Sequence, residues 1–297
     1  MVETMLLRLR NLAAVPLAAL LVLATSCANE GRELTRDEWA ELYSAYGIAL
    51  AVVHPDYGSD LLTDYSEPAN TLPTDAPAAV SVDLVPIPNG LGTSPTTVTL
   101  DPNTGGNHDL VTVRDSAATE VFRQGYLKGT GRPVRERRKL ERFLDGLDKA
   151  ISTSGLDHRK YGVALIAELD KPLTSDEMES ADLDNVASRV LFSTIGPADL
   201  PLSWSGDNCG PVHTQACDGT DDAEQFRAWL ESLSPAQRQA LTGKAFKLAE
   251  MQSAANDGRI SGLMIDWVEP GGALEIVRNP HVRAAYLAGV IQLDTVP

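Results

Sequence analysis

The second half of the chain alternates between two hydrophobic patterns, one typical of strands and one typical of helices. Short runs of Val, Ile, Leu and Ala bounded by Gly, Pro or Asp favour buried strands, whereas apolar residues spaced by three and four favour amphipathic helices. The runs predict strands at 161–169, 190–194, 260–268 and 282–291. The spaced positions predict helices from Pro133 to just before Gly155, from Thr174, and over 223–233, 235–255 and 272–279.

The order of these elements predicts an α+β fold. A strand, a helix and a strand are followed by a long insert with two helices, and then by another strand, helix and strand. This order favours a split βαβ, ferredoxin-like sheet with a helical insert, over residues 131–297.

The first half of the chain is less regular. A helix is predicted to begin after Thr35, which can form a capping box with Glu38, and apolar residues follow at helical spacing. Residues 48–53 fit either this helix or a buried strand. Short strands are predicted at 80–84, 96–100 and 110–113, with a hairpin connection at 101–107. Residues 34–130 therefore form a smaller N-terminal region of helix and short strands.

The first residues carry an export pattern. Arg8 and Arg10 precede an apolar run over 12–24, and small residues then lead to Cys27. A basic start, a short apolar run and small residues before a cut site are typical of a signal peptide. The run holds 13 residues, fewer than the ~20 that span a bilayer as a helix.

The cysteine after the small residues resembles the lipobox of bacterial lipoproteins. That resemblance implies that residues 1–26 are removed, that Cys27 is lipidated, and that residues 27–33 form a tether. The protein is then expected on the extracytoplasmic face of the cell membrane, held through its lipid anchor. The alternatives are an ordinary secretory signal that happens to contain a cysteine, and an uncleaved membrane anchor.

Composition and charge narrow the partners. Hydrophobic residues make up 43% of the chain, enough for a core, and the formal net charge is −16. An acidic protein repels nucleic acid and anionic lipid head groups. We therefore expect no nucleic-acid partner, and contact with the membrane through the acyl chains.

One basic cluster interrupts this acidity on the helix predicted from Pro133. Arg135, Arg138 and Arg142 belong to it, together with Lys128, Arg132, Arg137 and Lys139. The cluster can bind an anionic wall polymer or the acidic face of an envelope protein. One alternative is a solvated helix face on which Glu136 and Glu141 pair locally with the cations. Another is an intramolecular dock of the cluster against the acidic remainder of the chain.

Two cysteines lie close together in a loop predicted over 203–222. In an oxidising compartment Cys209 and Cys217 are expected to form a disulfide. The alternative is a zinc site that adds His213 and either Asp207 or Asp218. The acidic residues of this loop also suit calcium, or the N-terminus of the next helix. Trp204, beside the loop, is a candidate ligand contact, with core packing as its alternative.

Four segments of the second half resemble a known family. They are YGVALIAELDKPLTSDEM (161–178), PLSWSG (201–206), ISGLMIDW (260–267) and EIVRNPHVRAAYLAGV (275–290). They are similar to the C-terminal, extracytoplasmic domain of bacterial sigma-factor regulators. Those proteins also need a cytosolic domain, for which the residues before the apolar run leave no room. The resemblance therefore implies an outward-facing sensing or binding module.

Catalytic signatures are absent from the sequence. It contains no HExxH, no Gly-x-Ser-x-Gly and no phosphate-binding glycine-rich loop before a helix. We therefore expect a binding, sensing or envelope-interaction protein without a cofactor or a resident metal. An extracytoplasmic hydrolase whose catalytic residues are dispersed along the chain is the first alternative. A solute-binding protein is the second.

Overall fold

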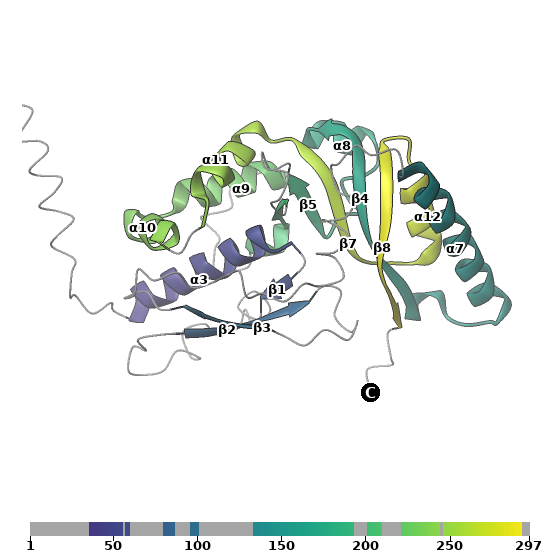
Figure 1. The fold of residues 1–297 in the computed structure, drawn as a ribbon, viewed down its shortest axis with the longest axis horizontal. Coiled ribbons are helices and arrows are strands. Elements are labelled where there is room, and N and C mark those ends of the chain that lie inside the picture. The colour runs from purple at the N-terminus through teal and green to yellow at the C-terminus, as the bar shows by residue number, and fades with distance from the viewer. Residues whose placement is uncertain are drawn as a thin grey trace, which may run out of the picture.

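The fold centres on a five-stranded antiparallel sheet in the second half of the chain (Figure 1). The computed structural model describes residues 36–55, 57–59, 80–86, 96–100, 133–192, 201–209, 221–243 and 246–292. The strands of the sheet are β4 (Tyr161–Leu173), β5 (Arg189–Phe192), β6 (Leu202–Trp204), β7 (Ile260–Val268) and β8 (Val282–Gln292). Their order is β6-β5-β7-β4-β8, and all neighbours are antiparallel.

Helices connect strands that are not neighbours in this sheet. Helix α8 (Ser175–Ser180) links β4 to β5, which lie on either side of β7, and α12 (Pro270–Arg278) links β7 to β8, which lie on either side of β4. The α+β prediction is confirmed. The more specific ferredoxin-like assignment stays a prediction.

Two sequence expectations for the helical insert were wrong. Strand β6 occupies residues 202–204, which we had placed largely in the cysteine-bearing loop. The single helix expected over 235–255 is two helices, α10 (Pro235–Gly243) and α11 (Leu248–Asp257). Between them Phe246 turns into the core, where its ring lies 6.2 Å from the ring of Tyr46. Burial of this aromatic side chain offsets the loss of helical continuity.

The two faces of the five-stranded sheet differ. On one face, alternate residues of the strands pack with α7 (Pro133–Thr153), α9 (Asp222–Ser232), α11 and α12 in the main hydrophobic core. The intervening residues form a smaller apolar cluster on the other face: Ala164, Ile166, Leu191, Met264 and Ala288. The described helices thus contribute their buried side chains to one face.

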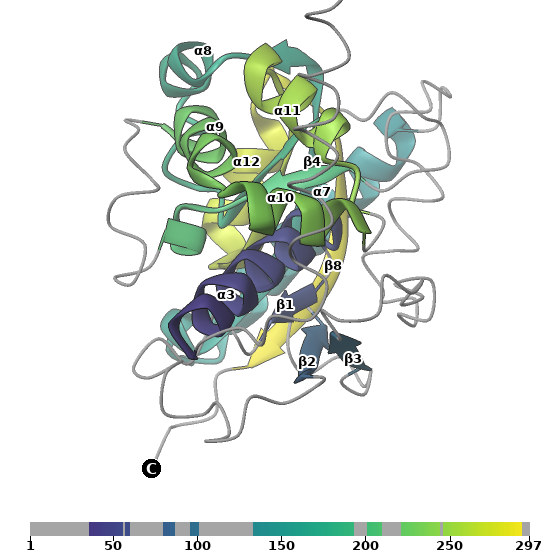
Figure 2. The same ribbon diagram turned by 90° about the vertical axis from the view of Figure 1, so that its left-hand side faces the viewer.

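Helix α3 (Arg36–Val53) joins the same main core. The helix is continuous, so residues 48–53 are helical and not a strand. It packs against β6 and α10, and Figure 2 shows it lying below α10. Ser203 is buried in β6, and its hydroxyl donates a hydrogen bond to the carbonyl oxygen of Ala51 at 2.7 Å. This bond fastens the end of α3 to the edge of the sheet.

A second, smaller sheet belongs to the N-terminal region. It contains β1 (Tyr57–Ser59), β2 (Val80–Pro86) and β3 (Thr96–Leu100) in that order, and both pairings are antiparallel. Helix α3 contacts this sheet through β1. The strands predicted at 80–84 and 96–100 are confirmed, whereas the strand at 110–113 and the hairpin at 101–107 lie outside the described residues.

The apolar spacing that predicted helix α7 comes from Leu140, Phe143, Leu144, Leu147 and Ile151. Leu140, Leu144 and Ile151 are buried and Leu147 is partly buried, but 44% of Phe143 is exposed. The helix ends as expected, because Gly155 takes a left-handed φ of 64° and the amide of Leu156 donates to the carbonyl of Ile151 at 3.2 Å. Within the described ranges, no helix combines the length and apolarity needed to cross a membrane.

Candidate functional site

Several of the sequence-predicted residues lie outside the part of the chain that the structure describes. Cys27, His213 and Cys217 are among them, as is the side chain of Arg135. Cys209 ends a short 3-10 helix, η3 (Gly206–Cys209), and its side chain also lies outside the description. The Cys209–Cys217 disulfide and the alternative zinc site therefore stay predictions.

Trp204 lies in the core. Its side chain has an exposed fraction of 0%. Its ring stacks on Phe226 at 4.9 Å and lies 5.7 Å from the ring of Trp229, both on α9. An indole enclosed by two aromatic rings stabilises the packing of α9 on β6. This placement favours core packing over a ligand contact.

The arginines of α7 whose side chains the structure describes differ in direction. Arg137 points inward, where its guanidinium donates to the carbonyl oxygens of Val282 and Asn279 and pairs with Glu141 at 3.3 Å. It therefore fixes α7 to the turn before β8. The local pairing expected for Glu141 thus exists for this arginine.

Arg138 and Arg142 are exposed instead, one helical turn apart. The Nε of Arg142 donates to the carbonyl oxygen of Arg138 at 3.2 Å. Among the described residues, no carboxylate lies within salt-bridge distance of either guanidinium. We call Arg138 and Arg142 the basic stripe. It belongs to α7, which lies at the opposite end of the long axis of the molecule from the start of α3 (Figure 1).

A cluster of Ser, His and Asp side chains, which no sequence motif indicated, lies at the end of α7. The Oγ of Ser152 is 3.0 Å from Nε2 of His158, which belongs to the 3-10 helix η2 (His158–Lys160). The Nδ1 of His158 is 3.5 Å from Oδ1 of Asp148. These contacts follow the order of a nucleophile, a base and an orienting carboxylate.

Two features of this cluster differ from a typical hydrolase site. The Ser152 hydroxyl also donates to the carbonyl oxygen of Asp148 at 2.9 Å, so it already has an acceptor other than the imidazole. Ser152 is exposed and the side chains of His158 and Asp148 are 36% and 37% exposed, so water reaches the cluster. Asp148 also lies beside Gly271, in the first turn of α12, where a carboxylate stabilises the helix dipole.

A charged pair is buried in the sheet. Glu168 on β4 is 1% exposed, and Arg283 on β8 donates to its carboxylate. Glu168 pairs with Ala284 and Leu169 with Val282, so Arg283 is the extra residue of a β-bulge. A bulge re-aims a side chain, here toward Glu168. The pair joins β4 to β8 at the bulge.

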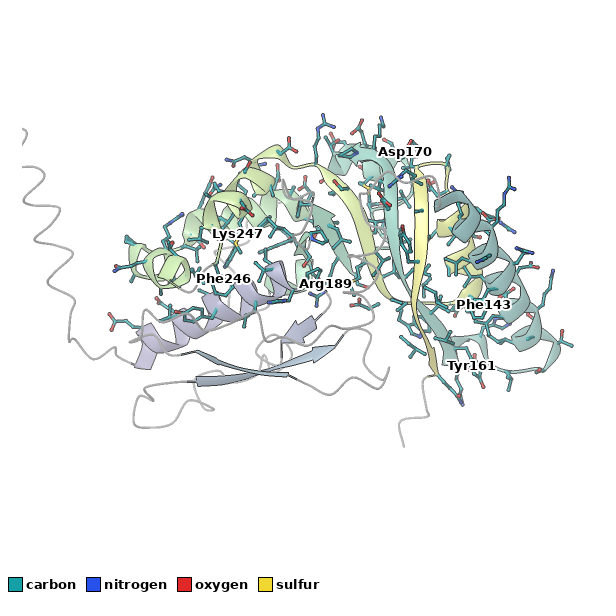
Figure 3. All side chains as sticks on the ribbon, in the orientation of Figure 1. Phe143, Tyr161, Asp170, Arg189, Phe246 and Lys247 are labelled. Atoms are coloured by element: carbon teal, nitrogen blue, oxygen red, sulfur yellow. The ribbon has the colours of Figure 1, made fainter. Side chains whose placement is uncertain are left out.

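More charged side chains lie at the same end of the sheet, where Figure 3 labels Asp170 at the far end of β4 from Tyr161. The Nδ1 of His281 is 3.9 Å from Oδ1 of Asp170. Lys171 and Arg259 approach Glu177 at 3.6 and 3.9 Å. These pairs are exposed and contribute little to stability. Nowhere in the described ranges do three or more His, Cys, Asp or Glu residues gather as potential metal ligands.

Comparisons with protein-family models, with curated proteins and with solved structures give no match to this chain. The functional proposal therefore has to come from the residues themselves.

Proposed function

We propose that this protein is a lipid-anchored extracytoplasmic lipoprotein with a binding, sensing or envelope-interaction role. The observation that carries the proposal is the signal pattern that ends at Cys27. Two further features support it. The four segments that resemble the outward-facing domain of sigma-factor regulators fall on β4, β6, β7 and the α12–β8 unit. The exposed basic stripe on α7 offers a surface for an anionic partner.

The anchor would hold the folded body close to the membrane. Only residues 28–35 separate Cys27 from the start of α3 at Arg36. Eight residues reach at most ~28 Å when fully extended. Because α3 belongs to the main core, the tether would connect the lipid directly to the folded core.

The intact mass of the protein, purified from its own membrane, tests this proposal. We expect the mass of residues 27–297 with added acyl chains. Reduction of the Cys209–Cys217 disulfide should increase this mass by two hydrogen atoms. A Cys27→Ser variant should leave the membrane fraction or retain its signal peptide, whereas Cys209→Ser should stay anchored. Retention of residues 1–26 in the native protein would contradict the lipoprotein assignment.

An extracytoplasmic hydrolase is the second candidate, because Ser152 Oγ lies 3.0 Å from His158 Nε2. A fluorophosphonate probe labels a serine that a neighbouring base activates. If the cluster is catalytic, labelling should disappear in Ser152→Ala and persist in Ser154→Ala, which removes an exposed serine two residues away. Absence of labelling in the native protein would exclude this candidate.

A further inference from the structure

We propose that the basic stripe on α7 binds a linear, phosphate-bearing polymer of the cell envelope. This inference rests on the proposed extracytoplasmic role and names a partner class for it. Arg138 and Arg142 are exposed, and no described carboxylate lies within salt-bridge distance of them, because the acids three residues on, Glu141 and Asp145, pair with Arg137 and Lys149 instead. In a chain with a formal net charge of −16, two adjacent cations without an acidic partner are unusual.

The rest of α7 shows that acidic partners are available on the same helix. Lys149 pairs with Asp145 at 2.6 Å, and Arg137 pairs with Glu141 at 3.3 Å. The basic stripe has no such arrangement. Like charges four residues apart on a helix repel each other. An external anion would relieve this repulsion, since it would neutralise both guanidinium groups at once.

The chemistry of the stripe favours phosphate groups in a row. A guanidinium presents a planar fork of donors that binds phosphate through two parallel hydrogen bonds. Arg138 and Arg142 are about 6 Å apart along the helix axis, because each residue adds about 1.5 Å. Two guanidinium groups spaced along the helix suit consecutive phosphate groups of a linear polymer better than they suit a single small ion.

The acidic remainder of the protein repels polyanions, so binding is confined to this part of α7 and weakens with salt.

The position of α7 suits a partner away from the membrane. The tether would enter at the start of α3, and α7 lies at the other end of the long axis (Figure 1). If the long axis of the molecule stands away from the membrane, α7 lies farther from the head groups than α3 does, and the basic stripe is within reach of the envelope.

Binding of the full-length protein, purified in detergent, to immobilised inorganic polyphosphate tests the inference. We expect Arg138→Gln/Arg142→Gln to lose about tenfold or more in affinity, because two charge-assisted contacts are removed. The charge-matched control is Lys171→Gln/Lys247→Gln, which removes two exposed lysines that have carboxylate partners at 3.6 and 3.4 Å. The control should change affinity less than about threefold, since its side chains lie outside the stripe.

Three outcomes would overturn the inference. Equal losses in both double variants would indicate a general effect of net charge. If Arg138→Gln/Arg142→Gln binds polyphosphate as tightly as the native protein does, the binding site lies outside the basic stripe. Equal affinity for polyglutamate of matched charge would remove the preference for phosphate and point to an acidic protein as partner. None of these results depends on lipidation of Cys27, so failure of the stripe and failure of the lipoprotein assignment are distinguishable.

Discussion

At the scale of single residues, Gly162 shows how closely the side chain of Trp267 packs on strand β4. Gly162 is buried in β4, and a Cβ atom built there would overlap the indole ring of Trp267, on neighbouring β7. A methyl group would therefore have to displace the ring. We expect Gly162→Ala to lower the free energy of unfolding by about 1–3 kcal/mol, as overpacking does elsewhere. Urea denaturation measures this change.

Gly146 provides the matched control for this substitution. It lies on α7, and a Cβ there would meet nothing within 4 Å. Gly146→Ala should raise the free energy of unfolding by roughly 0.5–1 kcal/mol, because alanine favours the helix. In a Trp267→Ala background the cost of Gly162→Ala should vanish. An equally mild effect at both glycines would contradict the close approach.

At the scale of elements, α8 depends on its first turn. The Thr174 hydroxyl accepts from the amide of Glu177 at 3.3 Å, and the Glu177 carboxylate accepts from the amide of Thr174 at 2.9 Å. The amide of Thr174 lowers the pKa of Glu177, and the charges of Lys171 and Arg259 lower the same pKa further. The ionised carboxylate therefore stabilises the folded state.

The lowered pKa of Glu177 predicts a stability contribution that depends on pH. The contribution is fully present above the unfolded pKa of about 4.3 and is lost as pH falls through the lower folded pKa. Glu177→Gln keeps a side chain that can accept the Thr174 amide but has no charge. At pH 7 the native protein should therefore unfold at a higher urea concentration than Glu177→Gln does. The gap between the two urea midpoints should be smaller at pH 3. A gap of the same size at both pH values would contradict the assignment.

Thr174→Ala serves as the control that does not titrate. It removes the other half of the capping box, and we expect a loss of about 1 kcal/mol at both pH values. Since the native sequence shows the capping residues Thr174 and Glu177 three apart, the start of α8 was predictable from the sequence alone.

The elements that could be predicted share long, uninterrupted patterns. Strands β7 and β8 carry long apolar runs, and helix α7 carries enough apolar positions at helical spacing, to fix their type. Strand β6 has three residues, too few to show a period. The break before α11 was missed because Leu241, Leu248 and Met251 keep helical spacing across it, and all three pack against the core.

Surface chemistry was harder to predict than the fold. Arg137, Arg138 and Arg142 belong to one basic segment, and of the three only Arg137 lies three and seven residues before the buried Leu140 and Leu144, on the face that packs inward. The partners of Arg137 at Val282 and Asn279 are more than 140 residues away in sequence, and the fold alone brings them close. The contact of Ser152 with His158 depends in the same way on the turn after α7.

At the scale of the whole molecule, α3 connects the proposed anchor to the main core. Ile48, Leu50 and Val52 on α3 are at most 1% exposed and belong to the same hydrophobic cluster as Leu165 and Ala167 on β4. Such burial stabilises each large side chain by roughly 1.5–3 kcal/mol relative to an exposed one. Removing α3 would therefore expose a substantial part of the core.

This shared core predicts that α3 unfolds together with the five-stranded sheet. Native-state hydrogen exchange measures the free energy at which each amide opens, and a shared cooperative unit gives one common value. We expect the amides of Leu50 and Val52 to open at the same free energy as those of Leu165 and Ala167, equal to that of global unfolding. If the α3 amides open at a clearly lower free energy, α3 is a separate unit that docks on the sheet. Force applied through the proposed anchor would then detach α3 first, whereas in a single unit it would pass to the sheet through the shared core and the hydrogen bond between Ser203 and Ala51.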